Sequence, residues 1–215
     1  DDISVMRTLP NMTVLETGDA TEVESICEAA DKIDGPVYCR ILRGAVPRLF
    51  DTPLKVGNIR KLSDGNDILV VTSGIATEEA LRASASLKNA GVSIKHIHLN
   101  TLKPINENEI SEHVQSVKYG VVSLENHLVN GGIGSIIAEI IAKFGISKKL
   151  IKLGLQDTFA HGGSKPYLMK YYGLDAYTLI KSITKLIDQK ININESDLDN
   201  VRIENVHSLS KEEAL

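Results

Sequence analysis

The sequence contains no tryptophan, and its 215 residues include only two cysteines, three methionines and three phenylalanines. With so few aromatic side chains, the core has to be built from Ile, Leu, Val and Ala. Cys27 and Cys39 lack the spacing of a metal-binding set, so we expect two reduced core thiols in a cytoplasmic protein. No apolar stretch is long enough to span a bilayer, which predicts a protein without a membrane segment.

Neither acidic nor basic residues are in large excess. The formal net charge is −4 and the pI is near 5.9, which gives no general electrostatic reason to bind nucleic acid or an acidic membrane. Hydrophobic residues make up 42% and charged residues 24%, as in ordinary globular proteins. These values exclude neither an enzyme nor a binding module, and motifs have to decide between them.

Short apolar runs alternate with helix-period patterns along most of the chain. This alternation is typical of an α/β protein whose mostly parallel sheet is covered by helices on both faces. The predicted strands are residues 12–16, 37–42, 68–72, 92–99, 120–124 and 150–155. The predicted helices are residues 1–8, 20–33, 77–90, 107–117, 133–144, 166–172 and 175–187. Asp19 is the expected N-cap of the second helix, with Glu22 in the capping-box position.

The pattern divides the chain into four parts. Residues 1–44 give helix, strand, helix and strand, which is part of a parallel sheet but too little to close one. Residues 45–66 carry scattered Pro and Gly and are expected to form a linker, with a short edge strand at 55–61. Residues 67–190 form a complete α/β domain, and residues 191–215 form a polar tail. Because a helix pattern starts at the first residues, we expect a piece of a longer polypeptide.

The most informative stretch is residues 119–135, YGVVSLENHLVNGGIGS. A buried strand ends in Glu125-Asn126-His127, and glycines then open an amphipathic helix. Open α/β sheets place their working surface at the carboxyl ends of the strands, and a helix that starts there directs free N–H groups into the crevice. The glycines do not match the dinucleotide fingerprint G-x-G-x-x-G.

Arg40 is the first candidate for ligand binding, because it carries a charge on an otherwise mostly apolar strand. A guanidinium at the end of a strand can grip a phosphate or a carboxylate through two parallel hydrogen bonds. The alternative is a structural ion pair with a carboxylate such as Glu16 or Asp19. Arg43 follows in the pattern R-x-x-R-G, and anchoring of the linker is its simpler interpretation.

Three further groups each allow a chemical and a structural interpretation. Glu125 and His127 are separated by one residue and could form an acid/base pair, or they could make structural hydrogen bonds at the sheet edge. Ser73 and Gly74, together with Thr77, could cradle an anion or cap a helix. His96 and His98 share one face of a strand, but no third ligand lies at metal-like spacing, so we predict no metal site.

Six segments in order resemble landmarks of transketolase-like, thiamin-diphosphate-dependent enzymes. They are DDISVMRTLPNMTVLETGDATEVE, PVYCRILRG, TSGIATEEAL, HLNTLKPINE, VSLENHLVNGGIGS and QDTFAHGGSKPYLMKYYGLDA. The first two resemble the second half of the pyrimidine-binding domain, and the others resemble the transketolase C-terminal domain. The resemblance implies an α/β fold of mostly parallel, doubly wound sheets, in which an incomplete pyrimidine-binding piece is followed by a complete C-terminal-type domain.

The resemblance also implies a function. The chain would be one component of a transketolase that moves a two-carbon ketol unit between sugar phosphates, with thiamin diphosphate and Mg²⁺ in the complete enzyme. Arg40 corresponds to a contact with the substrate phosphate, Arg43 extends that pattern, and the loop of His161 lies at a domain interface in the family. The cofactor-activating residues precede the matched region in the family, so we expect no catalytic residue here and no cofactor bound by this chain alone. The implied partners are an N-terminal subunit with the diphosphate-binding domain and a second copy of the chain.

Other functions stay open. A synthase that joins pyruvate to a triose phosphate and a β subunit of a 2-oxoacid dehydrogenase have related architectures. A non-catalytic α/β module for anion binding or assembly is the alternative from a different class. Against it, such a module has no use for half of another sheet, whose first strand would have an open edge.

Overall fold

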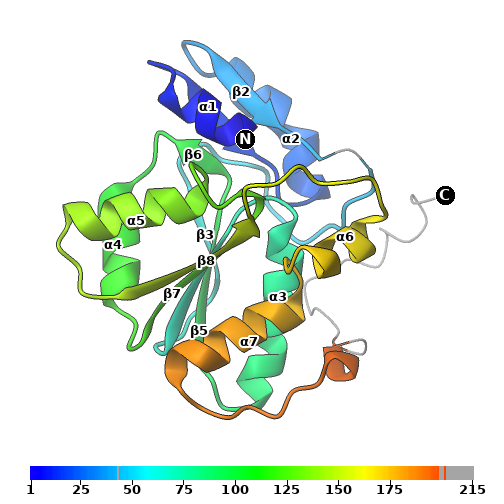
Figure 1. The fold of residues 1–215 in the computed structure, drawn as a ribbon. Coiled ribbons are helices and arrows are strands. Elements are labelled where there is room, and N and C mark those ends of the chain that lie inside the picture. The colour runs from blue at the N-terminus through cyan, green and yellow to red at the C-terminus, as the bar shows by residue number, and fades with distance from the viewer. Residues whose placement is uncertain (43, 199–200, 202–215) are drawn as a thin grey trace.

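The computed structural model describes residues 1–42, 44–198 and 201. It has two parts, which are stacked on one another (Figure 1). We call residues 1–40 the N-terminal lobe, and we call residues 59–187 the C-terminal domain. Arg43 lies outside the described residues, as do residues 199–200 and 202–215 of the predicted tail.

The N-terminal lobe follows the predicted order of helix, strand, helix and strand. Its elements are α1 (Asp2–Thr8), β1 (Thr13–Glu16), α2 (Ala20–Asp31) and β2 (Val37–Arg40). β1 and β2 run parallel, in a register that pairs Glu16 with Arg40. The predicted N-cap is confirmed, since Asp19 Oδ1 accepts from the backbone N–H of Glu22 at 2.8 Å.

A third strand, absent from the predicted elements, completes the sheet of the lobe. β6 (Thr101–Lys103) comes from the C-terminal domain and pairs antiparallel with β1, so the strand order is β2-β1-β6. The expectation of an open edge on the first strand is therefore wrong. Pairing across the two parts covers that edge and fixes the lobe on the domain.

The C-terminal domain is built on a five-stranded sheet of order β3-β5-β4-β7-β8. Its strands are β3 (Ile59–Ser63), β4 (Ile68–Thr72), β5 (Ile94–Leu99), β7 (Gly120–Leu128) and β8 (Lys149–Leu155). All neighbours are parallel except β3, which is antiparallel to β5. The edge strand predicted at 55–61 thus lies at 59–63 and belongs to this sheet.

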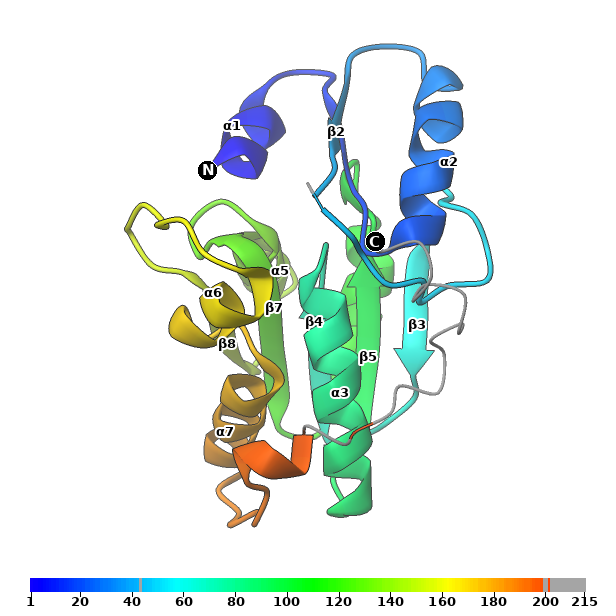
Figure 2. The same ribbon diagram turned by 90° about the vertical axis from the view of Figure 1, so that its right-hand side faces the viewer.

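Helices cover both faces of this sheet, which confirms the predicted doubly wound α/β fold. They are α3 (Ala76–Asn89), α4 (Glu107–Gln115), α5 (Ile133–Lys143), α6 (Lys165–Tyr171) and α7 (Ala176–Ile187). α3 and α7 lie on one face, in front of the sheet in Figure 2, while α4 and α5 lie on the other.

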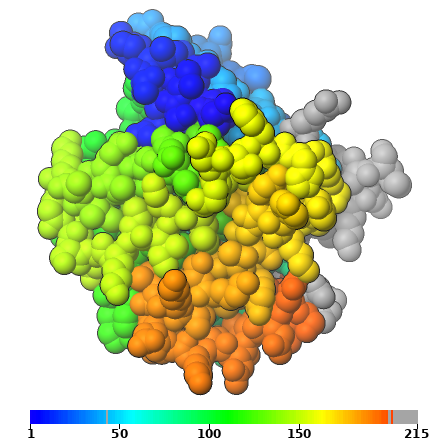
Figure 3. All heavy atoms as spheres, in the orientation of Figure 1, coloured from blue at the N-terminus to red at the C-terminus, as the bar shows by residue number. Residues whose placement is uncertain are grey.

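The lobe and the domain share a hydrophobic core. One apolar cluster lies under α3 and α7, and a second joins the opposite face of the sheet to α4 and α5. This second cluster includes Ile3 and Val14 of the N-terminal lobe, both fully buried. On the face seen in Figure 3, the lobe accordingly contacts the domain directly.

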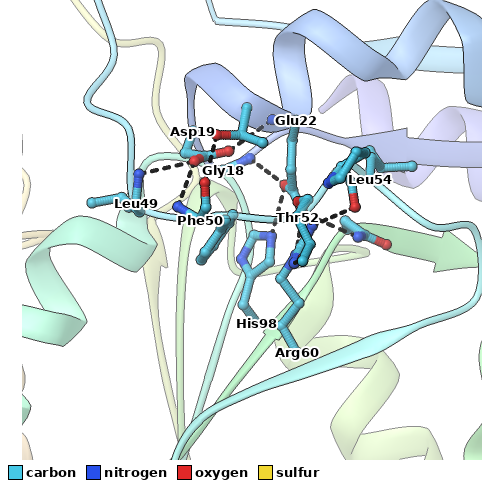
Figure 4. A network of polar contacts seen from close by, with 12 residues as sticks. Gly18, Asp19, Glu22, Leu49, Phe50, Thr52, Leu54, Arg60 and His98 are labelled. Atoms are coloured by element: carbon cyan, nitrogen blue, oxygen red, sulfur yellow. Dashed lines mark hydrogen bonds and ion pairs between the residues drawn. The ribbon is translucent and has the colours of Figure 1, made fainter. Parts of the chain in front are cut away.

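A polar network adds to this contact (Figure 4). Glu22 on α2 is fully buried and accepts from Arg60 Nε at 2.7 Å, and its other oxygen lies 3.1 Å from His98 Nε2 on β5. Asp19 Oδ2 accepts from the backbone N–H groups of Leu49 and Phe50 at 2.9 and 2.8 Å. The segment between the lobe and the domain is therefore packed against α2 over part of its length.

The described part of the predicted tail also makes contacts. A short 3₁₀ helix, η1 (Glu195–Leu198), ends in a buried leucine, and Arg82 Nη2 on α3 donates to the carbonyl of Leu198 at 2.9 Å.

No helix in the described ranges combines the length and apolar character needed to cross a membrane.

Candidate functional site

A pocket of about 250 Å³ lies where the carboxyl ends of β1, β2, β4 and β7 meet. Its lining includes Asp2, Glu16, Tyr38, Arg40, Gly74 and Asn126, which come from both the lobe and the domain. The carboxyl edge of parallel strands is the usual place for ligands in open α/β sheets. The pocket is therefore the candidate site, and Arg40, the first sequence candidate, lines it.

Three groups hold the Arg40 guanidinium. Nε donates to Asp2 Oδ2 at 2.8 Å, Nη2 donates to the carbonyl of Asn126 at 2.9 Å, and Nη1 donates to Glu16 Oε1. The Arg40 side chain keeps 23% of its surface exposed, whereas the Glu16 side chain keeps 3%. Of the two carboxylates considered from the sequence, Glu16 is a partner of Arg40, and Asp19 instead caps α2.

Asp2 is a second carboxylate at this arginine, and no local sequence pattern indicates this contact. Tyr38 Oη donates to the same Asp2 Oδ2 at 2.6 Å. Burial would raise the pKa of Asp2, but the Tyr38 hydrogen bond and the Arg40 charge outweigh it and lower the pKa to about 2. Burial and the same hydrogen bond raise the pKa of Tyr38 to about 12. These neighbours thus stabilise negative charge at the position of the Asp2 carboxylate.

The turn of Ser73 and Gly74 already faces an anion of the protein itself. A β-carbon added at Gly74 would lie 2.8 Å from Glu16 Oε1, so the Glu16 carboxylate contacts the turn that precedes α3. The hydroxyl of Thr77 is engaged elsewhere, 2.7 Å from His98 Nδ1 and 3.0 Å from Thr72 Oγ1. The N-cap of α3 is Ile75, without a side-chain hydrogen bond.

Glu125 and His127 make separate contacts with the backbone. The Glu125 carboxylate is fully buried and accepts from the N–H groups of Ile133 at 2.7 Å and Gly134 at 2.9 Å, at the start of α5. Burial raises the pKa of Glu125 to about 7, although these two hydrogen bonds oppose the shift. This geometry fits the structural alternative considered from the sequence.

His127 lies next to Asp2. Its Nδ1–H donates to the carbonyl of Leu128 at 2.9 Å, which assigns the proton to Nδ1. Burial lowers the pKa of this imidazole, so its neutral form presents a bare Nε2. That atom has no hydrogen-bond partner in the described part of the chain and lies 3.9 Å from Asp2 Oδ1.

His161 lies away from this pocket, within a group of aromatic side chains. Its ring is 4.8 Å from that of Tyr171 and 5.7 Å from that of Tyr167, and its Nδ1 is 2.8 Å from Tyr172 Oη. Phe159 in the same loop is 97% exposed, and Tyr167 and Tyr171 are 50% and 62% exposed. We call Phe159, His161, Tyr167, Tyr171 and Tyr172 the aromatic surface.

His96 and His98 contribute to a buried chain of hydrogen bonds. From Glu22 and His98 it continues through Thr77 and Thr72 to His96, whose Nε2 lies 2.9 Å from Thr72 Oγ1. Within residues 1–42, 44–198 and 201, no group of three or more His, Cys, Asp or Glu side chains could hold a metal ion.

Comparison with known proteins agrees with this architecture. The family model described as transketolase, C-terminal domain, matches residues 57–179, which is more than half of the chain. The chain belongs to the transketolase C-terminal domain family. The matched residues begin just before β3 and end within α7.

Two relatives and one solved structure extend the match beyond this domain. A Methanocaldococcus jannaschii protein, named provisionally as a transketolase C-terminal section, is 35% identical over 187 residues. A 1-deoxy-D-xylulose-5-phosphate synthase of Syntrophotalea carbinolica is 30% identical over 187 residues. A split-gene transketolase, solved as an inactive β4 tetramer, is 33% identical with a TM-score of 0.79.

These matches cover most of this chain but only part of each relative. They span 85% of this chain with the M. jannaschii protein, 85% with the synthase and 88% with the split-gene transketolase. The covered shares of those proteins are 58%, 29% and 62%. The activities and partners of whole transketolases therefore enter only as proposals.

The pocket does not fit the diphosphate group of a thiamin cofactor. Among the described residues that line it, Arg40 is the single basic side chain, and Asp2 and Glu16 already hold its guanidinium.

Proposed function

We propose that this chain is one component of a thiamin-diphosphate-dependent transketolase that transfers a two-carbon ketol unit between sugar phosphates. When bound, the cofactor and its Mg²⁺ supply the carbanion chemistry of such a transfer. This chain contributes binding and orientation of the substrate. We further propose a cytoplasmic location, since Cys27 and Cys39 are both free thiols.

The observation that carries the proposal is the junction between the two parts. The lobe and the domain follow each other in the order of the transketolase relatives, and they share one core and one pocket. Arg40 lines this pocket, and we propose that it meets the substrate phosphate together with Arg43. Arg40 also favours a phosphorylated substrate over that of a 2-oxoacid dehydrogenase.

The diphosphate-binding domain is assigned to a partner in this proposal. Two further relatives are named as subunits, one of a 6-deoxy-6-sulfo-D-fructose transketolase and the other of an apulose-4-phosphate transketolase. Transketolases that consist of separate subunits therefore exist among the relatives. We propose that this chain binds an N-terminal transketolase subunit that carries the diphosphate-binding domain.

We also propose a homodimer contact through the C-terminal domain, at the aromatic surface. Phe159 is 97% exposed in a chain that has only three phenylalanines, which is unfavourable unless another surface covers it. The loop of His161 belongs to this surface and would lie in the contact.

Complex formation tests the proposal. The purified chain is mixed with an N-terminal transketolase subunit from the same organism, and thiamin diphosphate binding is measured by calorimetry with Mg²⁺ present. We expect binding to the mixture and none to this chain alone. Failure of the two chains to form a complex would favour the alternative, an α/β module for anion binding or assembly. A complex that joins pyruvate to a triose phosphate would favour the synthase.

A further inference from the structure

Five fully buried side chains form a continuous hydrogen-bond relay from the lobe into the core of the C-terminal domain. It begins at Glu22 on α2, whose Oε2 lies 3.1 Å from His98 Nε2 on β5 (Figure 4). His98 Nδ1 lies 2.7 Å from Thr77 Oγ1 on α3, which in turn lies 3.0 Å from Thr72 Oγ1 on β4. The relay ends 2.9 Å further, at His96 Nε2 on β5.

The Glu22 carboxylate fixes one end of the relay. An ionised carboxylate only accepts hydrogen bonds, so His98 Nε2 carries a proton and donates to it. Burial would raise the pKa of Glu22, but the charge of His98 and the hydrogen bonds to the carboxylate outweigh it and lower the pKa to about 2. Glu22 therefore stays ionised, and the state of His98 depends on whether Nδ1 carries a second proton.

A doubly protonated His98 gives the relay one direction. Its Nδ1–H donates to Thr77 Oγ1, and the Thr77 hydroxyl donates to Thr72 Oγ1. The Thr72 hydroxyl then donates to His96 Nε2, so His96 holds its own proton on Nδ1. A neutral His98 reverses all three bonds, because its bare Nδ1 accepts from Thr77. Thr72 then donates to Thr77, and His96 donates from Nε2.

The far end of the relay does not fix this direction. His96 Nδ1 is buried and has no hydrogen-bond partner in the described part of the chain, so it is unsatisfied with or without a proton. Burial, followed by the charge of His98, lowers the pKa of His96 to about 3, and only the tautomer of this neutral ring changes. The other acceptor near Thr72, the carbonyl of Ile97, is 3.5 Å away, at the limit of a hydrogen bond.

The charge around His98 comes from the contact between lobe and domain. Glu22 reaches it from α2, and Arg60 from β3 donates through Nε to the other Glu22 oxygen at 2.7 Å. α3 contributes the uncharged Thr77, and the segment between lobe and domain contributes Phe50, whose ring is 5.1 Å from that of His98. A change in this contact therefore alters the balance of charge that acts on the His98 proton.

We propose that the relay is a proton-operated switch, in which loss of the second proton from His98 moves the proton of His96 from Nδ1 to Nε2. Each hydroxyl passes one proton on and gains another, so one proton in all is released to solvent. No backbone has to move. Thr72 is the last residue of β4 and precedes the turn of Gly74 at the candidate site, so the relay joins the lobe contact to this strand.

The inference goes beyond the proposed function and is tested on the purified chain alone. Nitrogen-15 NMR of the histidine-labelled chain distinguishes a ring nitrogen that carries a proton from one that does not. In a titration from mildly acidic to alkaline pH, we expect His96 to carry its proton on Nδ1 while His98 is doubly protonated and on Nε2 once His98 is neutral. Both changes should have the same midpoint.

Two variants interrupt the relay. Thr77→Val keeps the shape of the side chain but removes the hydroxyl, so His98 should lose its proton without a tautomer change at His96. Thr72→Val breaks the next link and should have the same effect, which provides a second test if one variant does not fold. Thr184→Val is the matched control, because the Thr184 hydroxyl donates to the carbonyl of Ile180 within α7, and it should leave the coupling intact.

The pairing of the two ring states decides the outcome. A proton on Nε2 of His96 beside a doubly protonated His98 would overturn the inference, and so would a His98 that loses its proton while His96 stays unchanged. Coupling that persists in both Thr77→Val and Thr72→Val would exclude the relay as its path. A His98 whose protonation is the same at every pH at which the chain is folded would exclude a switch.

Discussion

The carboxylate of Glu125 fills the space that a β-carbon on Gly132 would need. Such a carbon would lie 1.7 Å from Glu125 Oε2, far inside contact distance. We predict that Gly132→Ala destabilises the fold by about 2 kcal/mol or more, because the buried Glu125 carboxylate cannot move aside without losing its hydrogen bonds to Ile133 and Gly134. Thermal unfolding measures the effect.

Gly162→Ala is the matched control for this change. No atom lies within 4 Å of a β-carbon added there, so its unfolding temperature should equal that of the unmodified chain. Equal stability of Gly132→Ala would show that Glu125 does not cap α5 as described.

Glu125 also predicts a pH dependence of stability. Burial raises its folded-state pKa to about 7 from the ordinary 4.5, so the folded chain holds a proton that the unfolded chain releases between these values. The stabilising contribution is therefore fully present below about pH 4.5 and is lost as the pH rises through about 7. The shift corresponds to about 3 kcal/mol.

The variant Glu125→Gln does not titrate and provides the reference. The free energy of unfolding of both proteins is measured with denaturant at about pH 4 and about pH 8. Relative to Glu125→Gln, the unmodified chain should lose about 3 kcal/mol of stability between these two pH values. A stability difference between the two proteins that does not change with pH would contradict a buried Glu125 carboxyl with a raised pKa.

Glu22 is predicted to be the most sensitive charged residue at the contact between lobe and domain. Glu22→Gln keeps the shape but removes the negative charge opposite Arg60 and His98, which leaves a buried guanidinium without its counter-charge. Loss of one member of a buried pair costs about 3 kcal/mol. Glu24→Gln is the control on the same helix, since the Glu24 side chain is 63% exposed and its pair with Arg48 lies at the surface. A comparable loss of stability in Glu22→Gln and Glu24→Gln would contradict the role assigned to the buried Glu22 carboxylate.

The aromatic surface predicts an effect on assembly and none on folding. Phe159→Ser should shift the chain towards monomer in light scattering and leave its circular-dichroism spectrum unchanged, because this side chain is 97% exposed. Val5→Ser alters another exposed apolar residue, 57% exposed and outside the aromatic surface, and should leave the mass unchanged. An unchanged mass for Phe159→Ser would remove the support for a homodimer contact at this surface.

The local sequence predicts most of the C-terminal domain because its elements carry strong local patterns. The runs at 68–72 and 120–124 are apolar on both faces, as in central parallel strands, and the isoleucines of α5 recur at helical spacing. β6 is different. Three residues before Pro104 carry no strand pattern, and they form a strand only because β1, some 90 residues earlier, offers an edge.

The contacts of the candidate site are also hard to predict from the sequence, because they join residues that are far apart along the chain. The motif Asp19-x-x-Glu22 predicts a helix start, but the contacts of Glu22 with Arg60 and His98 join residues 38 and 76 positions apart. The charge of Arg40 on a mostly apolar strand indicates a partner, and Glu16 is one of the carboxylates that the sequence suggests for it. Asp2 carries no such signal, since an acidic residue in the first turn of a helix is ordinary.

The most direct test of the proposed function is a ketol-transfer assay on the reconstituted enzyme. This chain, extended at its N-terminus by the residues that precede the matched region in the transketolase family, is combined with an N-terminal transketolase subunit, thiamin diphosphate and Mg²⁺. A ketose phosphate donor is then supplied with an aldose phosphate acceptor. We predict transfer of a two-carbon unit that requires both chains and is weakened by Arg40→Met mainly through a higher KM for the phosphorylated substrate. A stable, cofactor-loaded complex of both chains that transfers no ketol unit from any sugar phosphate would contradict this function.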